Sequence, residues 1–381
     1  MPNFPKKLTQ KIQKRVSDNA LRELPIQNNL VDFSSNDYLG FSRETKIGEL
    51  AEEILKSSDA KNGATGSRLL SGNHPLYKIL EQQLSTFYNC EAALVFNSGY
   101  DANLGFFGAV PQRGDFIFYD ELSHASIRDG IRLSNASSYK FKHNDVEDLK
   151  TKVRAQSKTV DTTIYIVTES VFSMDGDSPD LVALAKFCSK NRYHLIVDEA
   201  HATGVFTNGK GLCEEKKITD KVFARIITFS KALGSHGAAI LGSTQLKEYL
   251  VNFARSFIYT TALPPQAIAT IIASYNLMSS EKGIGKRNTL LENIAHFKQE
   301  VKVNKLQKHF IESNSAIQCI TISGNIKVKA ISKNLKDVGF NVKPILSPTV
   351  SKGAERLRFC LHAFNTKEEI TQVVLLVKKY I

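Results

Sequence analysis

The chain has few cysteines, and their spacing fits neither a disulfide framework nor a zinc site. Its 381 residues include five cysteines, an odd number, and no two of them stand in C-x-x-C spacing. This usage is typical of a reducing compartment, so we predict a cytoplasmic protein. The cysteines are Cys90, Cys188, Cys213, Cys319 and Cys360.

Long apolar runs are also missing. No apolar stretch reaches the roughly 18 residues that a membrane-spanning helix needs, so we expect no membrane segment. Residues 1–24, "MPNFPKKLTQKIQKRVSDNALREL", are basic but lack the apolar centre of a signal peptide. We interpret them as an amphipathic helix. Internal repeats and low-complexity segments are absent as well.

Acidic residues are outnumbered by basic ones, 38 against 50, which gives a formal net charge of +12. Such a charge would allow nucleic-acid binding. However, the basic residues are spread along the chain and form no motif with interleaved aromatic residues. We therefore expect no nucleic acid as a partner, and we assign the charge to solubility or to attraction of anionic substrates.

Two catalytic motifs are missing, and each absence excludes a class of enzyme. The stretch "VDEAHATG" (197–204) contains the letters DEAH, but the chain has no G-x-x-x-x-G-K phosphate loop. Without that loop a helicase or ATPase interpretation fails. The H-E-x-x-H pattern of a zinc metalloprotease is absent too.

From residue 91 to 243, short apolar segments alternate with helical patterns. This alternation predicts an α/β fold, with a mostly parallel sheet that carries helices on both faces. Such sheets bind ligands beyond the carboxyl ends of their strands. The expected strands are 92–96, 115–120, 163–170, 193–201, 222–229 and 237–243, and the expected helices begin near 101, 123 and 179.

After about residue 285 the pattern changes. A long helix is expected over 288–310, and shorter helices over 327–339 and 366–381. Between them lie strand-like segments, which predict a smaller α+β domain with an antiparallel sheet. We therefore divide the chain into an N-terminal helix and short β segment (1–45), a large domain (46–285) and a small domain (286–381).

One lysine stands at an unusual place. In "IITFSKALGSHGAAILGS" (226–243), Lys231 lies between two apolar strands and among small residues. A surface turn that happens to contain lysine would explain this. The alternative is an amine kept away from water so that it acts as a nucleophile.

Three further polar residues belong to the same pattern. Asp198 ends an apolar strand, His201 follows it, and His124 lies in "DELSHASIRDG" (120–130). Asp198 could be a helix cap or ion-pair partner, and His124 could be structural. Pyridoxal phosphate (PLP) needs an amine, a carboxylate for its ring nitrogen, a phosphate cradle and often a flat group over the ring. The helix start "NSGYDANLG" (97–105) could supply the cradle, and the order of all these elements favours a PLP site.

Several longer stretches carry a resemblance to a known family. The chain resembles the α-oxoamine synthases, a branch of the fold-type I PLP enzymes, along essentially its whole length. The resemblance implies a mostly parallel seven-stranded sheet flanked by helices, with a smaller C-terminal α+β domain. The matching stretches are "FSSNDYLG" (33–40), "GATGSRLLSGNHPLYKILE" (63–81), "NSGYDAN", "DELSHASIRDG", "TESVFSMDGD" (168–177), "VDEAHATGVFTNGKG" (197–211), "TFSKALGSHGA" (228–238), "IYTTALPP" (258–265) and "SKGAERLRFCLHA" (351–363).

The resemblance implies roles for five residues at the PLP ring. Lys231 would bind the cofactor covalently and act as acid and base at the substrate's α-carbon. Asp198 would hold the pyridine nitrogen, and His201 would hydrogen-bond the 3-oxygen. His124 would stack on the ring, with Ser173 nearby.

The resemblance also implies how the phosphate is held. These enzymes share their active sites across a homodimer, so the phosphate would be contacted by both subunits. Thr260 and Thr261 would reach it from the partner. The residues around it within one subunit would be Gly99, Tyr100, Thr228 and Ser230.

Three residues are implied at the amino-acid substrate. Arg356 would clamp the carboxylate, because a guanidinium offers it a bidentate match. Asn36 would lie near the same substrate. Arg22, in the N-terminal helix, is a further substrate contact by resemblance.

The resemblance implies a reaction in which an amino acid and an acyl thioester condense with loss of CO2. The serine before Lys231, where many relatives have glycine, fits the branch that joins L-alanine to a pimeloyl group in biotin synthesis. The acyl group would be carried on coenzyme A or on an acyl carrier protein. The alternatives are glycine C-acetyltransferase, 5-aminolevulinate synthase and serine palmitoyltransferase activities. A non-catalytic subunit of the same fold is disfavoured because Lys231, Asp198 and His201 are all present.

Overall fold

The computed structural model describes residues 3–24, 29–157 and 159–381. The chain forms two compact units. The large unit comprises Asn36–Ser173 and Ser178–Asn288, and the small unit comprises the chain up to Ser35, Met174–Asp177 and Thr289–Ile381. The division of the sequence into domains at residues 45 and 285 stays a prediction.

The described residues of the large unit form a seven-stranded sheet with strand order β2-β8-β7-β6-β5-β3-β4. Strand β8 runs antiparallel to β2 and β7, and the remaining described pairs are parallel, which confirms the expected mostly parallel sheet. The strands are β2 (Ala92–Phe96), β3 (Phe116–Asp120), β4 (Ser137–Phe141), β5 (Ile164–Glu169), β6 (His194–Asp198), β7 (Ala224–Thr228) and β8 (Ala238–Gly242).

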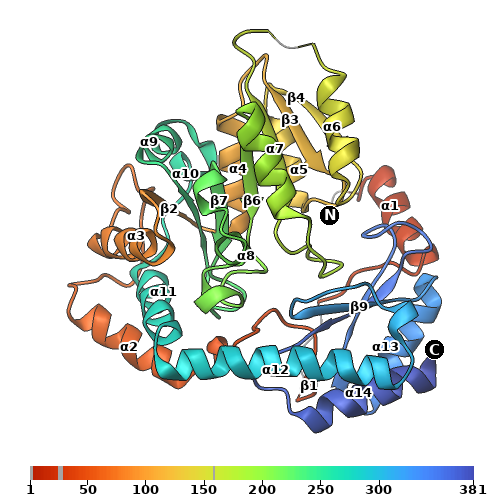
Figure 1. Cartoon of the computed structure of the whole chain (residues 1–381). Helices are drawn as coiled ribbons and strands as arrows, with labels where there is room; N and C mark the ends of the chain where they lie inside the picture. The colour runs from red at the N-terminus through yellow and green to blue at the C-terminus, as the bar shows by residue number, and fades with distance from the viewer. Residues whose placement is uncertain (1–2, 25–28, 158) are drawn as a thin grey trace. The chain divides into compact units, whose positions relative to one another are not determined.

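Helices cover this sheet, as Figure 1 shows for α4 and α7. Alternate residues of the strands, such as Leu94, Ile117 and Ile196, share one buried cluster with Phe106 of α4 and Ile127 of α5. The helices of the unit are α2 (Thr45–Lys56), α3 (Pro75–Tyr88), α4 (Gly99–Ala109), α5 (Ala125–Leu133), α6 (Val146–Arg154), α7 (Leu181–Asn191), α8 (Leu212–Glu215), α9 (Thr244–Phe253), α10 (Arg255–Ile258) and α11 (Pro265–Met278), with 3-10 turns at Phe41–Arg43, Thr207–Gly209 and Thr219–Lys221.

The described part of the small unit contains a three-stranded antiparallel sheet of order β11-β12-β9, which confirms the smaller α+β region expected after residue 285. A separate parallel pair joins β1 to β10 through Val31 and Phe340. The helix α12 (Glu281–Val303) begins in the large unit and continues into the small one. The other elements are α1 (Lys6–Ser17), β1 (Val31–Asp32), a 3-10 turn (Gln307–His309), β9 (Ile317–Thr321), α13 (Asn325–Asp337), β10 (Phe340–Asn341), β11 (Lys343–Ile345), β12 (Arg356–Cys360) and α14 (Lys367–Tyr380).

The expected N-terminal helix is present as α1, but it is shorter than residues 1–24. It ends at Ser17, and Asn19 then adopts a left-handed backbone with φ of 51°. Asparagine tolerates this conformation at helix ends better than most residues do. The placement of Arg22 in a helix is therefore wrong, because Arg22 lies in the irregular, exposed segment that follows.

Among the residues that the structure describes, no helix is both long enough and apolar enough to cross a membrane.

Candidate active site

The site begins with polar residues at the ends of adjacent strands. Asp198 is the last residue of β6, and it lies in register with Glu169, the last residue of β5. Thr228 ends the next strand, β7. Because parallel strands end at one edge of the sheet, these groups converge there, as expected for a ligand site of an α/β fold.

Lys231 follows β7 on a tight turn that connects to β8. The turn is closed by backbone bonds from Phe229 N–H to the Gly237 carbonyl (2.9 Å) and from Ser235 N–H to the Phe229 carbonyl (2.8 Å). Gly234 has φ of +59°, and a Cβ there would lie 2.2 Å from the backbone nitrogen of Ser42, so only glycine fits. Lys231 is half-buried at the carboxyl edge of the sheet.

Asp198 is buried, and both of its oxygens accept hydrogen bonds. Its side chain is 7 % exposed. Oδ1 accepts from the Ala200 N–H at 2.9 Å, and Oδ2 accepts from Asn103 Nδ2 at 3.0 Å. A buried carboxylate with two donors is held in one orientation, as a partner for a ring nitrogen requires.

His124 is the N-cap residue of α5 and is fixed through its backbone and its ring. The backbone N–H donates to Glu169 Oε1 at 2.6 Å. Ring Nδ1 accepts from the Ser126 N–H at 3.2 Å. Burial lowers the pKa of His124, and the Lys231 charge acts in the same direction, although Asp198 opposes both. These effects favour a neutral imidazole at neutral pH.

His201 is brought together with Asn36 by a tyrosine. His201 is 5 % exposed, and its Nδ1 lies 2.6 Å from the Tyr38 hydroxyl. Tyr38 in turn donates to Asn36 Oδ1 at 3.2 Å. Sequence reasoning missed Tyr38 as the residue that orients His201, although it lies in the matching stretch "FSSNDYLG".

The expected phosphate cradle is the N-terminus of α4. Ser98 caps this helix by accepting from the Asp101 N–H at 3.0 Å, and the helix begins at Gly99. A Cβ at Gly99 would lie 3.9 Å from the Thr228 hydroxyl, so the helix start and Thr228 are neighbours. Thr228 and Ser230 hydroxyls are 3.0 Å apart. Helix N–H groups together with hydroxyls form a site suited to a phosphate.

Tyr100, the next residue of α4, lies away from these hydroxyl contacts. It is 45 % exposed, and its hydroxyl donates to Asp129 Oδ2 at 2.7 Å. Its backbone belongs to the same helix start, so a role at the phosphate through the backbone N–H stays a prediction.

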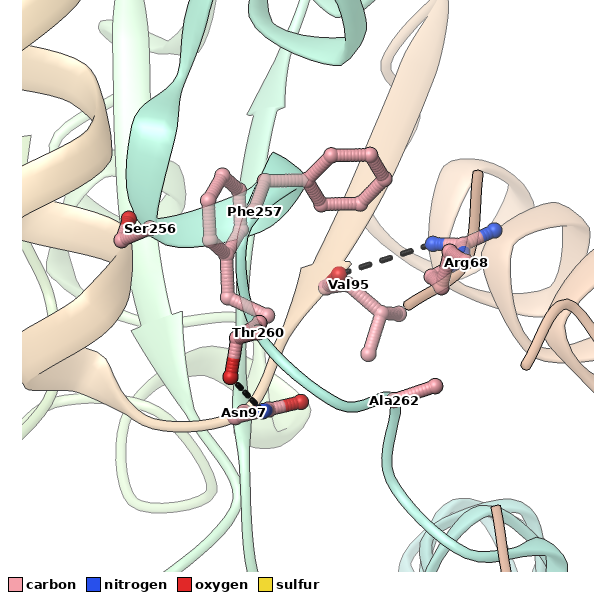
Figure 2. A pocket seen from close by; sticks show the side chains of 8 residues that line it. Arg68, Val95, Asn97, Ser256, Phe257, Thr260 and Ala262 are labelled. Carbon is pink, nitrogen blue, oxygen red and sulfur yellow. Dashed lines mark hydrogen bonds between the residues drawn. The ribbon is translucent and has the colours of Figure 1, made fainter. Parts of the chain in front are cut away.

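Thr260 and Thr261 lie beside this cradle within the same chain. Asn97, at the end of β2, donates through Nδ2 to Thr260 Oγ1 at 3.0 Å and to the Thr261 carbonyl at 2.7 Å. Figure 2 shows the Asn97–Thr260 bond at the rim of a small cavity. The cavity is lined by Arg68, Val95, Phe96, Asn97, Ser256, Phe257, Thr260 and Ala262. A contact of these threonines with a partner's phosphate stays a prediction.

The remaining predicted residues lie elsewhere. Ser173 is half-buried in the segment after β5. Arg356 and Arg22 belong to the small unit. There the Arg356 guanidinium pairs with Asp175 and donates to the Met174 carbonyl at 3.3 Å, and burial lowers its pKa. The Arg356 Nε donates to the Ala354 carbonyl at 2.9 Å, so Nε and Nη1 are both engaged within the small unit.

Sequence reasoning also missed Glu169. This carboxyl is 4 % exposed and accepts the His124 N–H. Burial, together with the neighbouring Asp198, raises the pKa of Glu169 to about 8, although Lys231 and the hydrogen bond from His124 oppose the change. The signal that identified Asp198, a carboxylate that ends an apolar strand, applies equally to Glu169.

The raised pKa of Glu169 predicts a pH-dependent stability of the cofactor-free protein. Between pH 4.5 and about pH 8 the folded state keeps a proton on Glu169 that the unfolded chain releases. The free energy of unfolding therefore falls as pH rises through this range, by at most about 1.4 kcal/mol per pH unit for one proton. Glu169→Gln removes this dependence, so the stability gained by the variant over wild type increases from pH 5 to pH 8.

Urea unfolding followed by circular dichroism at pH 5, 6, 7 and 8 measures this difference. Glu248→Gln, on the exposed side of α9, is the matched control and should follow the wild-type pH dependence. A constant difference between Glu169→Gln and wild type across these pH values would contradict the assignment.

The donor set fits PLP. A half-buried amine, an oriented carboxylate, a neutral imidazole and a hydroxyl-lined helix N-terminus match the aldehyde, ring nitrogen, ring face and phosphate of this cofactor. Lys231, Asp198, His124 and the start of α4 would hold it.

Comparison with known proteins agrees with this donor set. Residues 28–375 match the family model described as "Aminotransferase class I and II". The chain is 38 % identical to 8-amino-7-oxononanoate synthase of Emericella nidulans over 385 residues, covering 95 % of this chain and 92 % of that protein. It is 39 % identical to the enzyme of that name from Geotalea daltonii, covering 89 % and 86 %.

Solved structures share the same fold. Serine palmitoyltransferase of Sphingomonas wittichii superposes with a TM-score of 0.89 at 27 % identity, covering all of this chain and 98 % of that one. The 8-amino-7-oxononanoate synthase of Francisella tularensis superposes with a TM-score of 0.78 at 29 % identity, covering 93 % and 98 %. A serine palmitoyltransferase of S. paucimobilis with bound PLP gives 0.87 at 27 % identity, covering 98 % and 96 %.

The strand-end lysine and aspartate, the fold and the extent of these matches agree with one another. This chain belongs to the aminotransferase class I and II family and, within it, to the PLP-dependent acyltransferases known as α-oxoamine synthases.

Proposed function

We propose that this enzyme condenses L-alanine with a pimeloyl thioester to give 8-amino-7-oxononanoate, CO2 and a free thiol in biotin biosynthesis. The observation that carries the proposal is the 38 % identity, over 95 % of the chain, to a relative of that name. Among the solved structures, serine palmitoyltransferases are 26–28 % identical and the 8-amino-7-oxononanoate synthase is 29 % identical. The second candidate is a serine palmitoyltransferase-like activity, because those structures have the higher TM-scores, 0.80–0.89 against 0.78.

The residues of the site can carry this reaction. Bound PLP supplies an electron sink for negative charge that develops at the amino acid's α-carbon. The Lys231 amine would remove the α-proton there and later return a proton. The Asp198 carboxylate, oriented by Asn103 and the Ala200 N–H, would keep a proton on the ring nitrogen.

The histidines would orient the ring and exclude water from one face of it. Neutral His124 would pack on the ring, because its backbone and Nδ1 are both fixed by hydrogen bonds. His201, held by Tyr38, would hydrogen-bond the ring oxygen. Arg356 and Asn36 would bind the carboxylate of the amino acid, with Arg22 as a further substrate contact.

The acyl donor would be anionic. The net charge of +12 supports attraction of either coenzyme A or an acidic acyl carrier protein. The cysteines that the structure describes are free, which supports function in the reducing cytoplasm.

We also propose a homodimer. Leu70 is 84 % and Tyr259 is 72 % exposed. Their loops are joined by a backbone bond from the Ala262 N–H to the Gly66 carbonyl at 3.0 Å. Large apolar side chains exposed on connected segments are typical of a protein interface. A second copy there would place Thr260 and Thr261 next to a partner's site.

A substrate matrix tests the proposal. Alanine, glycine and serine are each assayed with acetyl, pimeloyl and palmitoyl thioesters, and sedimentation velocity gives the mass of the active species. We expect alanine with pimeloyl thioester to have the highest kcat/KM, by at least about tenfold, because one or more misplaced methylenes cost about 1–3 kcal/mol in an apolar pocket. A preference for serine with palmitoyl thioester would favour the second candidate instead, and a monomer would contradict the dimer.

A further inference from the structure

Asn103 lies between two groups of the site to which sequence reasoning gave separate roles. It is 1 % exposed on α4. Its Nδ2 donates to Asp198 Oδ2 at 3.0 Å and to Ser126 Oγ at 3.0 Å. Ser126 Oγ lies 2.8 Å from His124 Nδ1. A continuous chain of hydrogen bonds therefore runs from Asp198 through Asn103 and Ser126 to His124.

The direction of every proton in this chain follows from its ends. The Ser126 backbone N–H donates to His124 Nδ1, so Nδ1 carries no proton and the neutral ring holds its proton on Nε2. The Ser126 hydroxyl donates to the same nitrogen and is left to accept from Asn103. Asn103 then gives one amide hydrogen to Ser126 and the other to Asp198. The opposite orientation of the Asn103 amide would place its oxygen against the Asp198 carboxylate, where two acceptors repel each other, so the orientation with Nδ2 toward Asp198 is favoured.

The position of Asn103 on α4 strengthens this arrangement. Gly99, at the start of the helix, and Asn103 are four residues apart, so they lie on the same helix face. The start of α4 meets Thr228, and one turn later the same face meets Asp198. One rigid helix thus positions both the predicted phosphate cradle and the carboxylate.

We propose that Asn103 is a positioning residue of this site, whose amide links Asp198 to His124 through Ser126. It holds the carboxylate in the orientation that a ring nitrogen needs. Through the Ser126 hydroxyl it also supports the Nε2-protonated tautomer of His124, which the Ser126 backbone N–H already favours. The inference rests on the proposed function for its purpose, but the hydrogen-bond chain is a property of the protein without cofactor.

Asn103→Asp tests the link with almost no change in size. The new carboxylate would face Asp198 and accept from Ser126, which turns the hydroxyl proton away from His124. The added negative charge would raise the pKa of His124, which we expect to increase by about one unit. PLP binding to the apoprotein at pH 8 would weaken at least about tenfold, because two close carboxylates resist holding both charges.

Two readouts measure these effects without turnover. Nitrogen-15 NMR of labelled histidine in the cofactor-free protein gives the His124 tautomer and pKa, with His124→Gln used to assign the signals. Absorbance titration gives the Kd for PLP. Asn252→Asp makes the same chemical change at an exposed position of α9, where the amide donates only to the Glu248 carbonyl, and should leave both unchanged.

Ser126→Ala supplies a second variant that keeps the Asn103–Asp198 bond. The backbone N–H of residue 126 still donates to Nδ1, so we expect the Nε2-protonated tautomer to persist. Loss of the hydroxyl should move the Nδ1 signal and raise the pKa of His124, because the neutral ring loses one donor, with a smaller loss of PLP affinity. If Asn103→Asp does not fold, the His124 nitrogen shifts of Ser126→Ala test the same hydrogen-bond chain. Nitrogen shifts and Kd values equal to those of Asn252→Asp would overturn the inference. Because neither readout uses an acyl donor, this result is distinguishable from failure of the proposed reaction.

Discussion

Lys231→Ala is expected to abolish both turnover and the visible absorbance that PLP acquires when bound covalently. No other amine in the proposed reaction both holds the cofactor and transfers the α-proton. Loss of a positioned acid and base alone costs up to about 10⁴-fold in rate, and loss of the covalent link adds to that. The absorption spectrum of the purified variant with added PLP and its kcat/KM for alanine and pimeloyl thioester measure the two effects.

An exposed lysine provides the control for this change. Lys190 lies near the end of α7, where it is exposed and remote in sequence from the site. Lys190→Ala should therefore retain the wild-type absorption spectrum and kcat/KM. A Lys231→Ala variant with wild-type turnover would refute the assignment of this residue. Retained turnover with an altered spectrum would locate the proton transfer at another group.

Arg225→Met is expected to cause the largest loss of stability, about 3–5 kcal/mol in the free energy of unfolding. Arg225 is on β7 and Glu199 directly follows β6. Arg225 Nε donates to Glu199 Oε2 at 2.6 Å, and the two side chains are 6 % and 0 % exposed. Methionine fills a similar volume but leaves the Glu199 carboxylate buried without its countercharge.

The cost is large because Glu199 cannot reach water. Glu199 Oε1 accepts the Cys213 N–H at 2.9 Å, and a Cβ at Gly211 would lie 2.6 Å from the same oxygen, so the carboxylate is tightly enclosed. Urea unfolding of the cofactor-free protein measures the effect. The double variant Arg225→Met with Glu199→Leu should recover much of the loss, because it removes both charges. If Arg225→Met lowers the free energy of unfolding by less than about 1 kcal/mol, the Glu199 carboxylate is not destabilised by loss of its countercharge, and the prediction is contradicted.

Much of the large unit could be predicted because its strands are continuous apolar runs. β5 and β6 are buried on both faces, so their sequences "IYIVTE" and "HLIVD" are unmistakable. β4 was not predicted, because four of the five residues in "SSYKF" are partly or fully exposed at the sheet edge and carry no apolar run. An apolar run does not reveal the direction of its strand. Nothing in "AAILG" therefore indicated that β8 is antiparallel.

The residues of the candidate site also fall into those that the sequence predicts and those that it does not. Asp198 and Lys231 could be predicted because a charge at the end of an apolar strand is visible in the sequence. Asn103 and Tyr38 could not, because their significance depends on which residues tertiary folding brings within 3 Å. The end of α1 at Ser17, and with it the position of Arg22 outside the helix, could not be read from the basic pattern of residues 1–24.

The antiparallel direction of β8 has a consequence for how Lys231 is carried. Because β7 and β8 are neighbours of opposite direction, they are joined by residues 229–237 alone, whereas a parallel neighbour would need a crossover of a dozen or more residues. A short hairpin loses little conformational entropy when its ends are closed. The lysine is therefore carried on a short segment whose two ends are fixed by the pairing of the flanking strands. Insertions into this segment would be damaging because Ala232 and Leu233 are buried and Gly234 packs against the Ser42 backbone.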